Sequence, residues 1–281
     1  WGISFFAKSM SRDRFLHLLK LLRFDDKATR RRRLAHDKFA LVSEIWRKFV
    51  HNCQICYSPS GYITVDEQLF PSKVRCRFIQ FMPQKPDKYG IKFWMAVDCE
   101  SKYFLNGFPY LGKDDERPAS LTLGDYIIQK ITEPFWGKGH NITCDNFFTS
   151  LNSAKFLLTK RTSILGTVRN NRRELPSNLS TIMKTKTLCD SLSARSDKCI
   201  LTSYKCKRNK FVSLLSTLHD NVTFEGSKKK PNLIIDYNRT KCGVDVMDQM
   251  LRIYSCKVSS RRWPVQVSTS TIVHSKILIV Q

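Results

Sequence analysis

Between residues 62 and 171, extended and helical patterns follow one another in an order that few folds accommodate. Three strand-like segments come first, and a turn joins the last two closely enough for a hairpin, at 62–69, 91–98 and 102–110. Helices and strands then alternate, at 120–134, 140–148, 150–160 and 162–170. This order predicts an α/β (mixed) fold, in which helices lie against the faces of a mixed sheet.

The alternation of helices and strands stops near residue 170, and a similar apolar pattern resumes at residue 232. Between these points the chain is mostly polar, with two strand-like pieces at 199–205 and 211–218. We therefore expect an insertion that interrupts the core at 172–231.

The first 61 residues have a helical period. Apolar residues recur at helical spacing in 11–24, which a serine caps, and again in about 39–53. We expect a basic loop with four consecutive arginines between these helices. Their apolar faces would suit a partner or an internal core equally well.

The charge of the chain points to a polyanionic partner. Its 48 Lys and Arg against 24 Asp and Glu give a net charge of +24. The excess is uneven, because residues 1–61 and 172–231 each carry 13 basic and 5 acidic residues, a net charge of +8. The sequence shows neither an apolar run of membrane-span length nor a signal-peptide pattern, so we expect no membrane partner.

The ten cysteines show no paired framework, which favours reduced thiols in a nuclear or cytoplasmic setting. Cys53 and Cys56 have metal-like spacing, but no second CxxC follows at zinc-finger distance. They also close a helical run, which favours a pair of buried or half-buried thiols.

Four aspartates stand out as candidate site residues. Asp66 lies within the first strand and Asp145 at the end of the fourth, while Asp245 and Asp248 begin the helix that follows the insertion. Residues i and i+3 share a helix face, so the last two repel and need a cation, either Arg or Lys or a metal ion. An aspartate that ends a strand is more often a turn or a cap. The basic flanks favour the alternative, an oxygen cluster for Mg²⁺ that acts on a nucleic-acid phosphodiester.

Nine motifs in register over nearly the whole chain resemble the piggyBac-type transposase family. In chain order they are MSRDRF, DDK, VDEQL, PQKPDKYGIKFWM, KYFLNGFPYLG, NITCDNFFTS, GTVRNNRRELP, KCGVDVMDQM and RRWP. The resemblance implies a ribonuclease-H-like catalytic core with an inserted domain and flanking helical dimerisation and DNA-binding segments. The implied division is 1–61 (helical), 62–171 (core), 172–231 (insertion), 232–253 (core) and 254–281 (helical).

The resemblance also implies an activity and the residues for it. The family is a DDE/DDD transposase that cuts transposon ends flanked by TTAA through a nick and a hairpin, and joins them to a TTAA target. Its triad falls on Asp66, Asp145 and Asp245, with Asp248 at the same site. These residues would hold two Mg²⁺ or Mn²⁺ ions. The expected partners are double-stranded DNA and a second copy of the chain, in the nucleus. The residues expected to contact DNA phosphates are Arg30, Arg31, Arg32, Arg33, Arg172, Arg173, Lys228, Lys229, Lys230, Arg261 and Arg262.

Two departures from the family pattern qualify this expectation. Cys242 replaces the first glycine of the family's GGVD, which could alter the start of the helix. The family's C-terminal zinc module and acidic N-terminal region have no counterpart here, so no zinc site is expected and binding to transposon ends should be weaker. A fragment or a decayed copy would explain this. The alternative function is a domesticated DNA- or chromatin-binding protein without transposition activity.

Overall fold

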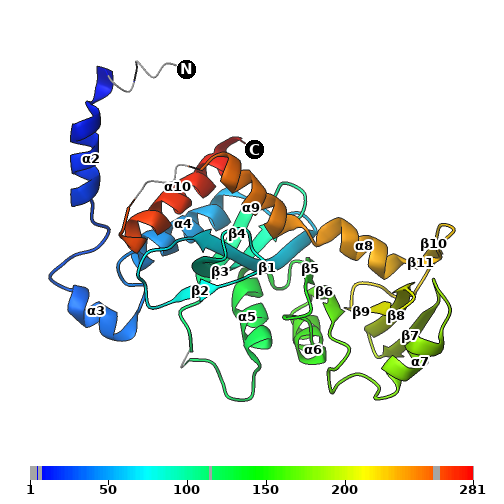
Figure 1. The fold of residues 1–281 in the computed structure, drawn as a ribbon. Helices are drawn as coiled ribbons and strands as arrows, with labels where there is room; N and C mark the ends of the chain where they lie inside the picture. Colours follow the sequence, from blue (N-terminus) through cyan, green and yellow to red (C-terminus); the bar gives the residue numbers. More distant parts are fainter. Residues whose placement is uncertain (1–4, 6–7, 114–115, 256–259, 281) are drawn as a thin grey trace.

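A computed structural model describes residues 5, 8–113, 116–255 and 260–280, with side chains as far as residue 275 (Figure 1). Its helices are α2 (Arg12–Leu21), α3 (Arg30–His36), α4 (Ser43–Cys56), α5 (Leu123–Thr132), the 3₁₀ turn η1 (Glu133–Phe135), α6 (Leu151–Thr159), α7 (Leu179–Thr185), α8 (Asn232–Thr240), α9 (Gly243–Ile253) and α10 (Trp263–Val280). Its strands are β1 (Tyr62–Pro71), β2 (Ile79–Phe81), β3 (Tyr89–Asp98), β4 (Phe104–Pro109), β5 (Asn141–Cys144), β6 (Ser163–Val168), β7 (Ser191–Ser196), β8 (Cys199–Lys207), β9 (Lys210–Ser216), β10 (Phe224–Glu225) and β11 (Lys230–Pro231).

Nine of the described strands form one mixed sheet. Its order is β2-β3-β1-β5-β6-β9-β8-β7, with β4 also paired to β3. Strand β1 is antiparallel to β3 and parallel to β5, which is in turn parallel to β6. The predicted mixed α/β class is confirmed, as is the hairpin of the second and third predicted strands, now β3 and β4.

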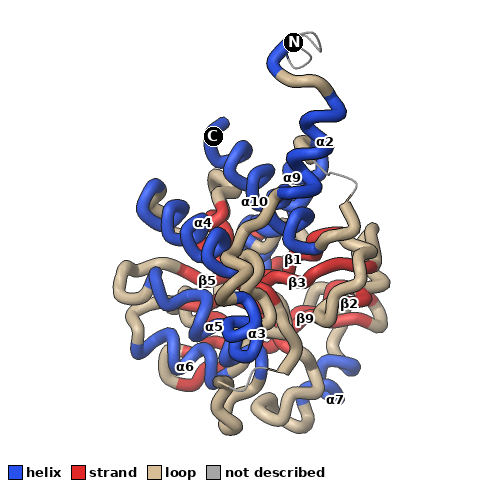
Figure 2. Tube along the Cα trace, turned by 90° about the vertical axis from the view of Figure 1, so that its left-hand side faces the viewer, coloured by secondary structure: helices blue, strands red, loops and turns tan. Residues whose placement is uncertain are grey.

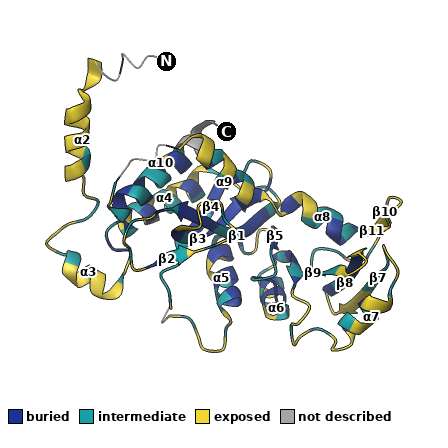
Figure 3. Cartoon of the chain, in the orientation of Figure 1, coloured by how far each residue is buried: buried dark blue, intermediate teal, exposed yellow. Residues whose placement is uncertain are grey.

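Helices cover both faces of this sheet. In Figure 1, α4, α9 and α10 lie above the central strands, and α5 and α6 lie below them. Strand β3 is buried along nearly its whole length because it lies between these layers. Figure 3 shows the same pattern, with buried central strands and exposed outer helix faces.

Aromatic side chains fill the space between the sheet and α4. The ring of Trp46 on α4 lies 4.8 Å from that of Phe93, and the Phe93 ring lies 4.2 Å from that of Phe70. His274 of α10 reaches the same cluster, with its ring 5.2 Å from Phe70. Such contacts each add about 0.5–1.5 kcal/mol beyond area burial, so they fix α4 and α10 on the sheet.

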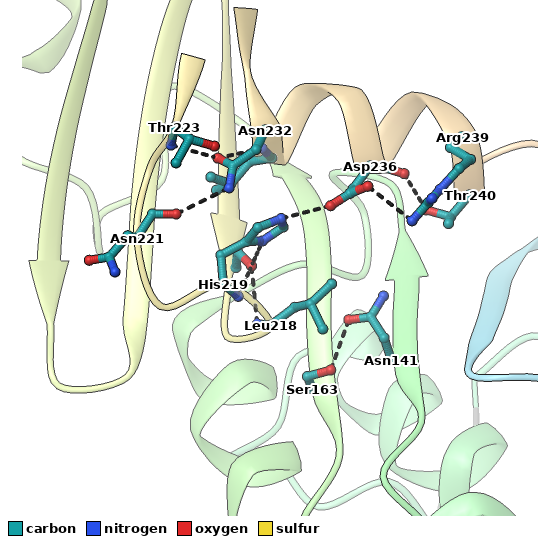
Figure 4. A network of polar contacts seen from close by, with 12 residues as sticks. Asn141, Ser163, Leu218, His219, Asn221, Thr223, Asn232, Asp236, Arg239 and Thr240 are labelled. Atoms are coloured by element: carbon teal, nitrogen blue, oxygen red, sulfur yellow. Dashed lines mark hydrogen bonds and ion pairs between the residues drawn. The ribbon is translucent and has the colours of Figure 1, made fainter. Parts of the chain in front are cut away.

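The strands of the predicted insertion extend the central sheet. Strand β9 pairs antiparallel with β6, and β8 and β7 follow outward. A polar network then ties the end of this segment to α8 (Figure 4). His219 Nε2 lies 3.0 Å from Asp236 Oδ2, and Asp236 also pairs with Arg239 at 3.0 Å. The boundaries of the insertion stay a prediction, but its strands continue the edge of the core.

The N-terminal region differs from its prediction in one element. The four arginines lie on the short helix α3, where a basic loop was expected, because Arg30 and Arg33 both pair with Asp25 and tie the segment to the preceding turn. The apolar faces of the two predicted helices differ in burial. Helix α4 packs into the core through Trp46, whereas α2 has no buried residue and extends away from the body in Figures 1 and 2.

Strand β2 was not predicted, because three residues are too few to show a period. Cys242 has φ −92°, which any residue adopts, so its replacement of glycine does not strain the start of α9. Cys53 is buried and Cys56 exposed at the end of α4, and the nine described cysteines are free. Within the described residues, no helix is both long and apolar enough to cross a membrane.

Candidate active site

Parallel pairing of β1 and β5 brings Asp66 beside Asp145. The last paired residues are Val65 and Cys144, and the two aspartates follow them at the same edge. Asp145 Oδ1 accepts a hydrogen bond from the backbone N–H of Phe147 (2.8 Å), which orients its side chain. Asp66, in the middle of β1, therefore lies beside Asp145 at the carboxyl end of β5, as expected for a convergence at this edge.

Gly243 allows α9 to begin directly above β1. A Cβ at this position would lie 2.4 Å from Thr64 Oγ1, so only glycine permits this approach. Thr64 in turn donates a hydrogen bond to the carbonyl oxygen of Thr240 at 2.6 Å, at the end of α8. Because Thr64 and Asp66 are two residues apart on a strand, they share the face that α9 covers. Asp245 and Asp248 consequently reach the same edge as Asp66.

The four predicted aspartates line one open cleft of about 790 Å³. Residues from the segment between β2 and β3 form its other wall, and the lining comprises Asp66, Glu67, Phe81, Met82, Pro83, Gln84, Lys85, Pro86, Asp145, Asp245, Asp248, Gln249 and Arg252. The structure thus brings together aspartates that are up to 182 positions apart in sequence.

The carboxylates in this cleft lack full charge compensation. Burial raises the pKa of Asp66 well above its usual value, and the charges of Glu67, Asp145 and Asp245 add to the shift. Burial likewise raises the pKa of Asp145, again with a contribution from Glu67. A raised carboxylate pKa means that the charged form is disfavoured unless a cation approaches.

Two lysines provide part of that positive charge. Lys92 Nζ lies 3.9 Å from Glu67 Oε2 and 4.0 Å from the centre of the Trp94 ring. Burial lowers the pKa of Lys92, although the charge of Glu67 opposes the shift. Lys85 Nζ lies 3.5 Å from Asp245 Oδ1 and donates to the backbone carbonyl of Glu67 at 3.3 Å.

Asp248 faces a different environment. Its Oδ1 accepts a hydrogen bond from Gln68 Nε2 (2.9 Å), and its Oδ2 accepts one from Arg252 Nε (3.3 Å). The i, i+3 pair that the sequence singled out therefore has basic partners in this structure, Lys85 for Asp245 and Arg252 for Asp248.

The donor set fits a hard divalent cation in chemistry. Carboxylate oxygens are what Mg²⁺ and Mn²⁺ bind, and the raised pKa values of Asp66 and Asp145 mark charge that a cation would stabilise. Among the residues that the structure describes, however, no three His, Cys, Asp or Glu side chains stand close enough to hold a metal ion.

Sequence reasoning missed four residues of this region. Glu67, Gln68, Lys85 and Lys92 were not singled out, although Lys92 is a lone basic residue in an apolar strand. Gln68 has the same strand parity as Asp66, which places it on the same face. Lys85 lies in a loop, where no period could reveal its position.

The predicted DNA-contacting residues fall into two groups. Four already have partners within the chain. Arg30 and Arg33 pair with Asp25, Arg172 donates to the carbonyls of Asn146 and Phe147, and Arg262 donates to the carbonyls of Leu19, Lys20 and Leu22 at the end of α2. The others lie exposed on the surface: Arg31, Arg32, Arg173, Lys228, Lys229, Lys230 and Arg261.

Comparison with known proteins gives a consistent result. A profile of the family described as Transposase IS4 matches residues 1–275. The human PiggyBac transposable element-derived protein 3 is 24% identical over 92% of this chain and 45% of its own length. The human Chimeric ERCC6-PGBD3 protein is also 24% identical over 92% of this chain, and 25% of its own length is covered.

A solved structure resembles the chain more strongly. It is a cryo-EM structure of a piggyBac transposase synaptic complex with hairpin DNA, with a TM-score of 0.89 and 39% identity over 95% of this chain and 56% of that one. This likeness confirms the predicted ribonuclease-H-like core. The chain spans about half the length of this transposase and of the first human relative. The chain belongs to the Transposase IS4 family and, within it, to the piggyBac type that its motifs indicate.

Proposed function

We propose that the chain is a piggyBac-like DNA transposase that hydrolyses phosphodiester bonds and transfers strands at transposon ends flanked by TTAA. One observation carries the proposal: Asp66, Asp145 and Asp245 reach a single cleft from two parallel strands and the helix above them. Double-stranded DNA as the partner, a homodimer and a nuclear location belong to the same proposal. The net charge of +24 supports a DNA partner.

In this proposal the chain's own residues bind and orient the substrate. Asp66, Asp145 and Asp245 would hold Mg²⁺ or Mn²⁺, which when bound activates a nucleophilic water or hydroxyl and stabilises the leaving oxygen. Lys92, fixed over Trp94, places a positive charge beside the carboxylates, where a DNA phosphate would enter. Exposed arginines and lysines contact phosphates farther from the cleft.

The test combines metal binding with DNA cleavage. Mn²⁺ should raise the melting temperature of the parent chain, and Mn²⁺ should support nicking of a TTAA-flanked duplex. Asp145→Asn should lose both effects, whereas Asp220→Asn, an exposed aspartate outside the cleft, should keep both. Cleavage that survives Asp145→Asn would refute the assignment of the site.

A second candidate is a DNA- or chromatin-binding protein that has kept the fold without the chemistry. It is favoured by the pairing of Asp245 with Lys85 and of Asp248 with Arg252, which offsets charge that a metal would otherwise offset. In that case the same duplex should bind in a salt-dependent manner, with no Mn²⁺-dependent nicking and no thermal shift.

A further inference from the structure

The two aspartates of α9 have different surroundings although they are three residues apart. Three residues advance a helix by about 300°, so their side chains diverge by about 60°. The side chain of Asp245 is 63% exposed, whereas that of Asp248 is 16% exposed. Asp245 therefore faces the open cleft, and Asp248 faces the boundary between α9 and its neighbours.

Gln68 is the contact of Asp248 on the sheet. It lies on β1 two residues beyond Asp66 and is 3% exposed, and its Nε2 donates to Asp248 Oδ1 at 2.9 Å. Its other amide atom, Oε1, lies 3.2 Å from His274 Nε2. A buried amide that loses a partner costs about 1–3 kcal/mol, so both contacts constrain its orientation.

His274 brings the C-terminal helix into this chain of contacts. It lies on α10 and is 2% exposed, with its ring 5.2 Å from that of Phe70 and 5.9 Å from that of Phe104. Its Nδ1 lies 2.8 Å from the carbonyl oxygen of Ser270, one turn earlier. These ring contacts and the contact with Ser270 hold the imidazole beside Gln68, so the position of His274 depends on how α10 packs on the sheet.

The other carboxylate oxygen of Asp248, Oδ2, is bonded to a residue of the cleft wall. Arg252, which donates to Asp248 Oδ2, also pairs with Asp87 at 3.4 Å. Asp87 belongs to the loop that carries Lys85, the residue in contact with Asp245. Asp248 thus connects β1, α10 and the cleft-lining loop through its two oxygens.

We propose that Gln68 is a positioning residue: it holds Asp248 at the inner face of α9 and, through His274, couples the docking of α10 to the placement of Asp245 in the cleft. The catalytic consequence rests on the proposed transposase function. The coupling itself does not, because it follows from contacts of the buried Gln68 and His274 with each other and of Gln68 with the half-buried Asp248.

The coupling can be tested without an activity assay, by asking whether the stability losses of two substitutions add. Asp248→Asn and His274→Leu alter residues that each contact Gln68, and the measurement is the urea midpoint of each single variant and of the double variant. With Gln68 present, the double variant should lose less than the sum of the singles. In a Gln68→Leu background, or Gln68→Met if the leucine variant does not fold, the losses should add. Additive losses in both backgrounds would overturn the coupling.

Cleavage kinetics test the positioning role. Gln68→Leu should lower kcat for Mn²⁺-dependent nicking by about 10- to 100-fold while KM for DNA stays unchanged, since the exposed basic residues are untouched. His274→Leu should behave alike, and His274→Gln, which restores a polar side chain beside Gln68, should recover most of the rate. The matched control is Gln266→Leu, because this glutamine lines the same cavity of about 80 Å³ and its Nε2 donates to the carbonyl oxygen of Ser260.

The two experiments separate the possible failures. Parent-like kcat in a folded Gln68→Leu protein would overturn the positioning role. If the parent chain does not nick DNA at all, the proposed function fails, and the urea measurements still decide whether Gln68 couples α10 to α9.

Discussion

Replacing Gly243 with alanine tests how α9 is placed above the site. The new Cβ would lie 2.4 Å from Thr64 Oγ1 and 2.9 Å from Thr64 Cβ. Ordinary contact begins at 3.4 Å, so the helix and the strand must separate by 1.0 Å or Thr64 must turn. Thr64 is 1% exposed, and its hydroxyl is bonded to the Thr240 carbonyl, so rotation would break a buried hydrogen bond.

The expected cost follows from these alternatives. Overpacking of this kind costs about 1–3 kcal/mol, and breaking the hydrogen bond costs about 1 kcal/mol. Alanine recovers at most about 1 kcal/mol from its higher helix propensity. We therefore expect Gly243→Ala to lose about 1–3 kcal/mol of unfolding free energy. Asp245, two residues along, should move with the start of the helix.

Urea unfolding followed by circular dichroism measures this loss. With a slope of about 2–3 kcal/mol per M, the midpoint should fall by roughly 0.3–1.5 M. Gly61→Ala is the matched control, because nothing lies within 4 Å of its added Cβ, and its effect should stay within about 0.5 kcal/mol. A Gly243→Ala protein as stable as the control would refute the close approach of α9 to β1.

Three other perturbations have expected outcomes. Asp66→Asn and Asp145→Asn should each raise the urea midpoint at pH 7, because burial raises the pKa of both carboxyls in the folded state and so makes their charged form costly. This gain should vanish below about pH 4, where the two carboxyls of the parent are protonated in the unfolded state as well. Burial lowers the pKa of His274 to about 4, so between pH 4 and about pH 6.5 the folded state binds fewer protons than the unfolded state. The free energy of unfolding of the parent should therefore fall by about 2 kcal/mol between pH 7 and pH 5, and His274→Leu should not show this loss. Arg262→Ala should speed tryptic cleavage after Lys20 with little effect on the core, because Arg262 holds the end of α2, whereas exposed Arg31→Ala should not.

Local patterns were sufficient for most elements of the fold. Ser11 caps α2 as predicted and accepts from the N–H of Arg14, and Ser150 caps α6 in the same way by accepting from the N–H of Ser153. The alternation over 120–170 predicted α5, β5, α6 and β6, because each has its own apolar period. The three-residue strand β2 has no such period, and it forms only because β3 offers it an edge.

The arginines show where sequence alone misleads. Four consecutive arginines indicated a basic loop, yet two of them pair with Asp25 and the segment forms helix α3. Arg262 was predicted to contact DNA, but its guanidinium already donates to three carbonyls at the end of α2. Net charge is a property of composition, whereas the availability of a charge depends on partners that folding brings.

The sequence determined which residues could form the acidic site. Asp66, Asp145, Asp245 and Asp248 carry the chemistry, and the strand and helix periods place them at element ends or on one face. Tertiary structure alone decided which of them face the same cleft. That outcome depends on parallel register between β1 and β5 and on a glycine that lets α9 touch Thr64. Burial then distinguishes the two aspartates of α9: Asp245 is largely exposed in the cleft, whereas Asp248 at its wall is half-buried and bonded to Gln68, because long-range packing sets exposure.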